Sequence, residues 1–191
     1  MSPLPRWRLR KAVRHLKTGG LIAYPTEGVW GLGCDPWNLE AVERILTLKQ
    51  RPVEKGLILI ASDFGQLMPF ILPPPKERFP QILRSWPGAV TWILPASPTC
   101  PAWIRGSHAT VATRVTAHPV AAALCRAFGA PLVSTSANPA QSPPALSALS
   151  LRRYFGRRAD LLLVPGPVGN LRGPTPIFDA LSGRCLRREG E

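Results

Sequence analysis

The chain has 191 residues, of which 45% are hydrophobic, so it can bury one substantial core, and we predict a single domain over residues 1–191. Its formal net charge of +13 favours a polyanionic partner but does not distinguish nucleic acid from nucleotide phosphates. No apolar run is long enough to cross a bilayer, and no apolar stretch of a signal peptide follows the basic N-terminus. We therefore expect a cytoplasmic protein with no membrane partner.

Helical and extended patterns alternate along the chain. In order, they predict a helix at 8–17, a strand at 21–25, a glycine-punctuated loop at 26–33, a helix at 39–48, a strand at 57–61, a helix at 63–70 and a proline-rich loop at 72–80. They then predict strands at 89–94 and 110–115, a helix at 119–128, a strand at 132–136, a helix at 147–155, strands at 160–164 and 177–179, and a hairpin around Gly183 that ends at Arg187. This order indicates an α/β fold with a mixed parallel/antiparallel sheet, because several connections are too short for a helical crossover.

The cysteines and histidines do not form a recognisable metal site. No CxxC pair is present and no histidine stands at ligand spacing from a cysteine, so we predict no protein metal site and four free thiols, most of them buried: Cys34, Cys100, Cys125 and Cys185. The histidines are expected at the surface or in turns: His15, His108 and His118.

A basic segment at the end of a predicted helix is the first candidate for phosphate binding. Lys49, Arg51 and Lys55 place three cations within seven residues, directly before the most apolar strand of the chain. The ends of strands are where α/β proteins tend to bind ligands. Cations at a helix C-terminus also interact favourably with the helix dipole, so the residues alone leave both explanations open. A P-loop or Rossmann site is not expected, because the glycines at 28, 31 and 33 have the wrong spacing.

Polar residues at two other strands are further candidates. Residues 134–138 read Ser-Thr-Ser-Ala-Asn, and such hydroxyls and backbone N–H groups can bind phosphate or carboxylate oxygens, although turn and capping roles are the alternative. Arg114 lies within an apolar strand, where it must find an anionic partner or reach a wet cleft. Thr26 follows Pro25 at the start of the glycine-rich loop.

Five ordered motifs together resemble the YrdC/Sua5 family from about residue 10 to the C-terminus. They are Pro-Thr-Glu-x-x-x-Gly-Leu-Gly at 25–33, Lys-x-Arg-Pro at 49–52, Arg114 followed by His118-Pro119, Ser-Thr-Ser-Ala-Asn at 134–138, and Pro174-Thr175 with Asp179 and Leu186-Arg187. Thr175 stands where the family usually has serine and keeps the hydroxyl. The histidine that larger members carry in the strand after the Lys-x-Arg motif is absent from residues 57–61.

The resemblance implies a twisted mixed sheet with flanking helices around a basic concave cavity, in which L-threonine and ATP lie side by side. It implies that L-threonine is held by Thr26, Arg114, Ser134 and Thr175. It implies that ATP is held by Lys49, Arg51, Lys55, Ser136, Asn138 and Arg187, and that the groups acting in catalysis are Lys49, Arg51 and Arg114. The implied activity is that of an L-threonylcarbamoyladenylate synthase, for the threonylcarbamoyl modification of tRNAs that read codons beginning with A.

In the implied reaction, threonine and bicarbonate or CO2 form N-carboxythreonine, which attacks the α-phosphate of ATP and expels diphosphate. Negative charge develops on the phosphate in this step, so catalysis depends on cations and on positioning of the substrates more than on a general base. Mg2+ would accompany ATP, held chiefly by substrate oxygens. Expected partners also include tRNA or other RNA at the basic surface and the downstream tRNA threonylcarbamoyl transferase proteins.

Two alternatives stay open. The first is a non-catalytic binder of double-stranded RNA or tRNA, which the net charge favours, although Trp86, Trp92 and Trp103 lie in apolar or proline-bounded contexts that suit a core more than a stacking platform. The second is a carbamoyl-adenylate-forming enzyme that uses carbamoyl phosphate, as the same module does in hydrogenase maturation. Diphosphate release that depends on threonine would separate the three hypotheses.

Overall fold

The structure is a computed structural model that describes residues 4–171 and 173–189. Its helices are α1 (Arg6–Lys17), α2 (Leu39–Lys49), α3 (Phe79–Ser85), α4 (Ala102–Arg105), α5 (Pro119–Phe128) and α6 (Ala148–Phe155), with the short 3-10 helices η1 (Val53–Lys55) and η2 (Gly65–Leu67). Its strands are β1 (Leu21–Pro25), β2 (Trp30–Gly33), β3 (Ile58–Ala61), β4 (Thr91–Pro95), β5 (Thr110–Val115), β6 (Leu132–Ser136), β7 (Leu161–Leu163), β8 (Ile177–Asp179) and β9 (Cys185–Arg187).

All of these strands form one sheet in the order β7-β1-β2-β6-β3-β5-β4-β8-β9. Neighbouring strands run parallel in the pairs β1–β7, β3–β5 and β4–β8. They run antiparallel in the pairs β1–β2, β2–β6, β3–β6, β4–β5 and β8–β9. The predicted α/β class, the mixed sheet and the C-terminal hairpin are therefore confirmed.

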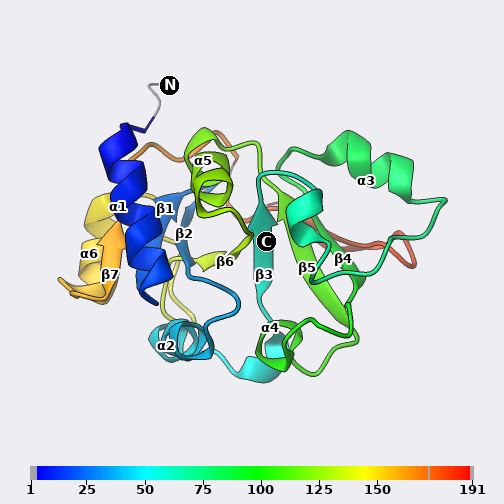
Figure 1. Cartoon of the computed structure of the whole chain (residues 1–191), viewed down its shortest axis with the longest axis horizontal. Coiled ribbons are helices and arrows are strands. Elements are labelled where there is room, and N and C mark those ends of the chain that lie inside the picture. The colour runs from blue at the N-terminus through cyan, green and yellow to red at the C-terminus, as the bar shows by residue number, and fades with distance from the viewer. Residues whose placement is uncertain (1–3, 172, 190–191) are drawn as a thin grey trace.

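Helices cover the two faces of the sheet unequally. On one face, α1 and α5 pack against each other and over β1 and β3, burying Leu16 and Leu124 against Ile22 and Ile60 (Figure 1). On the other face, α2, α3 and α4 contribute to the largest apolar cluster, which includes Leu59. A third cluster joins α6 to β1 and β2. α1 and α5 do not cover the whole of the first face, and the uncovered part can form a cavity.

The helix ends follow from their capping residues. Asn38 begins α2 by accepting a hydrogen bond from the N–H of Ala41 on its Oδ1, at 2.9 Å, and Gln50 ends it in the left-handed conformation with φ of 49°. Ser147 caps α6 in the same way as Asn38 caps α2. Gln50 redirects the chain so that the basic segment after α2 leaves the helix axis.

The prediction was wrong in four segments. The predicted loop at 26–33 contains β2, in which glycine is needed because a Cβ at Gly33 would lie 2.5 Å from the carbonyl oxygen of Val133 on the next strand. The predicted helix at 63–70 is only the 3-10 turn η2. The helices α3 and α4 were not predicted, because each has a proline at or next to its first turn, and proline usually indicates a loop. Proline is nevertheless tolerated at the start of a helix.

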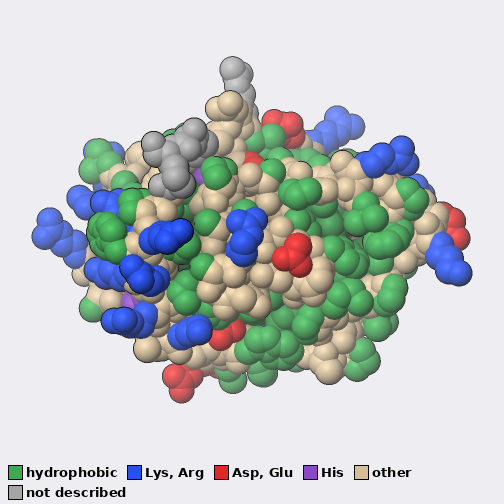
Figure 2. Space-filling view, turned by 45° about the horizontal axis from the view of Figure 1, so that its top comes forward, with side chains coloured by type: hydrophobic (Ala, Val, Ile, Leu, Met, Phe, Trp, Pro, Cys, Tyr) green, Lys and Arg blue, Asp and Glu red, His purple; other side chains and the backbone are tan. Residues whose placement is uncertain are grey.

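Basic side chains gather on one side of the molecule. Figure 2 shows many Lys and Arg side chains on the side that carries α1 and α6 in Figure 1. Six exposed basic residues come from α1 alone: Arg6, Arg8, Arg10, Lys11, Arg14 and Lys17. Within residues 4–171 and 173–189, no helix is long and apolar enough to cross a membrane.

Candidate active site

One cavity of about 750 Å³ opens on the part of the sheet that α1 and α5 do not cover. The register of the strands explains its position. Ile58 lines the cavity and pairs with Ala112 and Ser134, whereas Ile60, two residues further along β3 on the same face, is covered by α5. Every site residue that the sequence predicted lines this cavity: Thr26, Lys49, Arg51, Lys55, Arg114, Ser134, Ser136, Asn138, Thr175 and Arg187.

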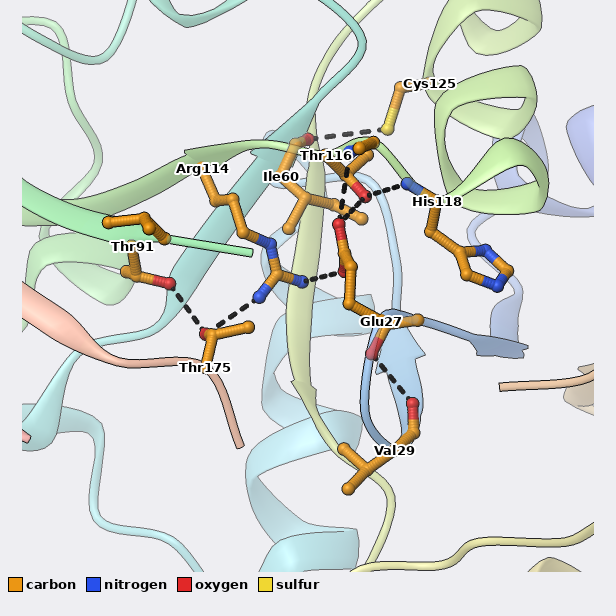
Figure 3. A network of polar contacts seen from close by, with 12 residues as sticks. Glu27, Val29, Ile60, Thr91, Arg114, Thr116, His118, Cys125 and Thr175 are labelled. Atoms are coloured by element: carbon orange, nitrogen blue, oxygen red, sulfur yellow. Dashed lines mark hydrogen bonds and ion pairs between the residues drawn. The ribbon is translucent and has the colours of Figure 1, made fainter. Parts of the chain in front are cut away.

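Arg114 lies at the centre of a buried polar network at one end of the cavity (Figure 3). Its Nη2 is 3.3 Å from Oε2 of Glu27, and its Nη1 donates a hydrogen bond to Oγ1 of Thr175 at 2.8 Å. The hydroxyl of Thr175 is in turn 2.9 Å from that of Thr91 on β4. Only 5% of Arg114 is exposed, so protein groups hold its guanidinium where it reaches the cavity. Both sequence expectations for Arg114 are met, because it has Glu27 as an anionic partner and it also lines the cavity.

Glu27 stays ionised in this network. Burial acts to raise the pKa of its carboxyl group, but the charge of Arg114 and the hydrogen bond from Thr116 outweigh burial and hold the pKa below its ordinary value. The bond from the hydroxyl of Thr116 to Oε1 is 2.6 Å long. An ionised carboxylate therefore compensates the buried charge of Arg114.

Small groups surround a gap beside the network. Thr26 uses its hydroxyl hydrogen within its own loop, donating to the carbonyl of Val29 at 2.7 Å. A Cβ at Gly31 would lie 3.3 Å from Cγ2 of Thr26 and 3.5 Å from Oγ of Ser134. The absence of a side chain at position 31 therefore keeps open the space between Thr26 and Ser134 in the cavity lining.

Lys49 is held in the cavity by the last residue of β6 and the segment that follows it. Its Nζ donates to the carbonyl oxygens of Ser136 at 2.6 Å and Asn138 at 2.9 Å, and lies 3.2 Å from Oδ1 of Asn138. Burial, with a smaller contribution from the charge of Arg51, lowers the pKa of Lys49 to about 8. The ammonium group therefore contacts the end of β6 and the segment after it. It does not hydrogen-bond the last carbonyl groups of α2, so the helix-terminus explanation does not account for Lys49.

Two arginines are oriented by neutral backbone groups. Arg51 donates from Nη2 to the carbonyl of Gly56 at 2.9 Å, and Arg187 donates from Nη2 to the carbonyl of Thr175 at 2.7 Å. Among residues 4–171 and 173–189, no carboxylate lies within ion-pair distance of Lys49, Arg51 or Arg187. Their positive charge therefore stays uncompensated and available to an anion in the cavity.

The cavity offers no carboxylate ligand for a metal ion. Its described lining contains no Asp or Glu side chain, and the described part of the chain holds no cluster of three or more potential ligands among His, Cys, Asp and Glu. These donors do not fit a Mg2+ ion bound by the protein itself, because Mg2+ prefers oxygen ligands that include carboxylates.

The sequence did not predict Glu27 and Thr91 as site residues, and it placed His118 at the surface or in a turn, of which only the position in the connection between β5 and α5 holds. A buried arginine requires an anion, and the acidic residue of the Pro-Thr-Glu motif was the signal that could have identified Glu27. His118 is buried and not at the surface. It begins α5 and has Nε2 3.1 Å from the carbonyl of Pro167, and burial lowers its pKa. His108 lies at the cavity as an exposed residue, and His15 is half-buried.

The four cysteines are free thiols, as expected. Three of them are buried, but Cys185 is exposed because it lies on β9 at the end of the sheet.

A mixed sheet with one deep, cation-lined cavity defines an α/β protein of the kind that binds anionic small molecules. A family model covers residues 14–190, that of Sua5/YciO/YrdC proteins, described as "Telomere recombination". The chain belongs to this family. It is 57% identical over 182 residues to the threonylcarbamoyl-AMP synthase of Halorhodospira halophila, covering 95% of each chain. It is 53% identical over 183 residues to the enzyme of the same name from Nitrosococcus oceani, covering 96% of this chain and 98% of that one.

Solved structures share the fold. Sua5 of P. abyssi complexed with L-threonine matches with a TM-score of 0.85 and 31% identity over 93% of this chain. This chain spans only about half of that protein, 52% of its length. YciO of E. coli matches with a TM-score of 0.85 and 26% identity, covering 98% of this chain and 92% of YciO. T. kodakarensis HypF, at 21% identity and a TM-score of 0.76, supports the fold alone.

Proposed function

We propose that this protein is an L-threonylcarbamoyladenylate synthase, a nucleotidyltransferase that converts L-threonine, bicarbonate or CO2, and ATP into threonylcarbamoyl-AMP and diphosphate. The observation that carries the proposal is that one cavity combines a fixed, buried arginine that is paired with Glu27 and three cations that no described carboxylate compensates, Lys49, Arg51 and Arg187. An amino acid carboxylate and a triphosphate need these two environments side by side. The names of the most similar relatives support the same activity.

The threonine end is built around Arg114. With one hydrogen on Nη1 used by Thr175 and one on Nη2 facing Glu27, the guanidinium retains the second N–H of Nη1 and of Nη2 for a carboxylate. Ser134 and Thr26 border the gap where the amino acid would extend. Thr26 can accept a hydrogen bond there, because its own hydrogen is already donated to Val29.

The ATP end is built around Lys49, Arg51 and Arg187, with Lys55, Ser136 and Asn138 beside them. The carbamate oxygen of N-carboxythreonine would attack the α-phosphate, the bond from that phosphorus to the bridging oxygen would break, and diphosphate would leave with the electron pair. Fixed cations stabilise the charge that develops in this step without a proton transfer. Mg2+ enters with ATP as part of the substrate, with phosphate oxygens as its ligands.

The product is expected to pass to downstream threonylcarbamoyl transferase proteins, which modify tRNA. The basic side that carries α1 supports a sequence-independent attraction to RNA, because its exposed cations would replace counterions along a phosphate backbone. RNA binding that weakens steeply with salt, without any ATP consumption in the presence of threonine, would favour the non-catalytic alternative.

The decisive experiment measures diphosphate release by the purified protein with ATP, Mg2+, bicarbonate and L-threonine, and with each component omitted in turn. A parallel reaction contains ATP, Mg2+ and carbamoyl phosphate, with and without L-threonine. Release that requires threonine and bicarbonate is expected. Release driven by carbamoyl phosphate and indifferent to threonine would replace the proposal by the carbamoyl-adenylate alternative. Absence of release under all conditions would overturn the enzymatic function. Arg126→Ala, an exposed change on α5 outside the cavity, serves as the control variant.

A further inference from the structure

Glu27 lies behind the cavity, not in its wall. Its neighbours Thr26 and Gly28 line the cavity, whereas Glu27 is buried beside Arg114 and is not part of the described lining. A substrate in the cavity would therefore meet Arg114 and not Glu27. Any influence of Glu27 on the substrate has to act through the arginine.

The two carboxylate oxygens of Glu27 have different partners (Figure 3). Oε1 accepts hydrogen bonds from the hydroxyl of Thr116 at 2.6 Å and from the N–H of Ala117 at 3.1 Å. Oε2 faces Nη2 of Arg114 at 3.3 Å and is not hydrogen-bonded to any described residue. One oxygen thus anchors the carboxylate to the bend after β5, and the other is left to act on the guanidinium.

Arg114 is consequently held from two sides. Glu27 acts on Nη2 from the loop after β1, and Thr175 accepts from Nη1 in the segment before β8. The Nε atom of Arg114 is buried and has no partner among the described residues. A long arginine side chain has many rotamers, so two fixed contacts remove most of the ordering that a ligand would otherwise have to impose.

Glu27 has two opposite effects on a bound carboxylate. Its negative charge weakens the attraction of Arg114 for a second anion, while its contact keeps the guanidinium in place. The contact is the stronger effect here, because Glu27 uses one oxygen at one nitrogen and leaves the remaining N–H groups of the fork free. Without Glu27, Arg114 would be a buried cation without a counter-charge and would turn toward the wet cavity.

We propose that Glu27 is a positioning residue that fixes Arg114 for the carboxylate of the amino acid substrate. This inference rests on the proposed function, in which Arg114 receives L-threonine. Glu27 should act mainly on the amino acid end, because Arg114 is its only described cationic contact. The cations assigned to ATP are held by backbone carbonyl groups: Lys49 by Ser136 and Asn138, Arg51 by Gly56, and Arg187 by Thr175.

Two substitutions separate positioning from simple support of the loop. Glu27→Gln keeps the size of the side chain and an oxygen for Thr116, but it turns an NH2 group toward Arg114 and removes the charge. Thr116→Val keeps the shape of that side chain and removes its hydrogen bond to Glu27, while the ion pair with Arg114 remains. If Glu27 only tethered the loop, Thr116→Val would weaken threonine binding and Glu27→Gln, which keeps the acceptor for Thr116, would not.

The test is calorimetric titration of L-threonine, and separately of a non-hydrolysable ATP analogue, into the full-length protein and both variants. Glu27→Gln should weaken threonine binding about tenfold or more and leave the nucleotide Kd within about twofold. In the steady state, KM for threonine should rise more than kcat falls. Thr116→Val should change threonine affinity less than Glu27→Gln does.

Threonine binding by Glu27→Gln that equals or exceeds that of the unaltered protein would overturn the inference, because Glu27 would then be a tether or a competitor for Arg114. Failure of the unaltered protein to bind threonine would instead refute the proposed function. If Glu27→Gln does not fold, Glu27→Asp decides the matter, since its shorter carboxylate cannot reach Thr116 and Arg114 together. Selective loss of threonine affinity in Glu27→Asp supports positioning, and unchanged affinity overturns it.

Discussion

Glu27 and Arg114 form an ion pair that joins distant parts of the sheet beside the cavity. Their charged atoms are 3.3 Å apart, and about a tenth or less of each side chain is exposed, at 11% and 6%. Glu27 follows β1 and Arg114 lies in β5, while β2, β6 and β3 lie between these strands in the sheet. The pair therefore links the fold and the site, and its loss affects both.

Acidification should weaken the fold through Glu27. Burial raises the pKa of this carboxyl group, but Arg114 and Thr116 outweigh burial and bring the pKa below the ordinary value of 4.5. A group with a lowered pKa contributes stability that is complete above its unfolded-state value and is lost as the pH falls through the folded-state pKa. The difference in Tm between the unaltered protein and Glu27→Gln should thus be largest near neutral pH and shrink below pH 4.5.

Thermal unfolding followed by circular dichroism between about pH 3 and 7 measures this difference. Glu77→Gln, at an exposed site before α3, is the matched control and should follow the unaltered protein at every pH. A Tm difference for Glu27→Gln that is constant over the whole pH range would mean that the carboxylate charge does not stabilise the fold.

The sequence predicts most of the sheet because its strong patterns coincide with the observed elements. The apolar run at 110–115 and the helix at 119–128 appear in the structure with the same bounds. The pattern fails at β2, where contact with Val133 requires glycine and so removes the β-branched signal of a strand. It also fails at α3, where tertiary packing of Ile82 makes a helix of a proline-containing segment.

The sequence also identifies the residues that line the cavity, but it does not show how they contact one another. The predicted residues occur in short motifs at strand and helix ends, and the fold brings these ends together. The ion pair of Glu27 with Arg114 and the bonds from Lys49 to Ser136 and Asn138 join residues far apart in the chain. Neither periodicity nor motif spacing indicates which distant residues come into contact, so these contacts could be identified only from the structure.

Nucleotide affinity should fall at alkaline pH through Lys49. Burial, with help from Arg51, lowers the pKa of Lys49 to about 8, so the ammonium charge is present below that pH and is lost above it. Titration of a non-hydrolysable ATP analogue from about pH 7 to 9.5 should give weakening affinity above pH 8. Lys49→Arg keeps its charge over this range and should give a flatter profile. Equal profiles for the two proteins would show that Lys49 does not titrate in the site.

The two ends of the cavity should respond to different substitutions. Arg51→Ala should weaken nucleotide binding by about tenfold or more and spare threonine, because it removes a charge that only carbonyl oxygens contact. Arg114→Ala should weaken threonine binding by a similar factor and spare the nucleotide. Arg126→Ala, outside the cavity, should change neither. Equal loss of both ligands in Arg51→Ala and Arg114→Ala would contradict the division of the cavity into two ends.

Gly28 controls how closely the segment before β8 approaches the loop after β1. A Cβ at Gly28 would lie 2.0 Å from the carbonyl oxygen of Gly173 and 3.1 Å from that of Leu171. The two segments are also joined by a backbone hydrogen bond from Leu171 to Glu27, at 3.0 Å. Because both partners are backbone, neither moves cheaply, and Gly28→Ala should lower the free energy of unfolding by about 1–3 kcal/mol.

The same substitution should act on the threonine end of the cavity. Thr175 lies two residues after Gly173 in the displaced segment and accepts the hydrogen bond from Arg114, so threonine binding should weaken more than nucleotide binding. Urea unfolding and the two ligand titrations measure these effects. Gly65→Ala is the matched control, because its Cβ would meet only the flexible side chain of Asp63, at 3.2 Å. If Gly28→Ala and Gly65→Ala were equally stable and bound threonine equally well, the close approach at Gly28 would not hold the segment in place.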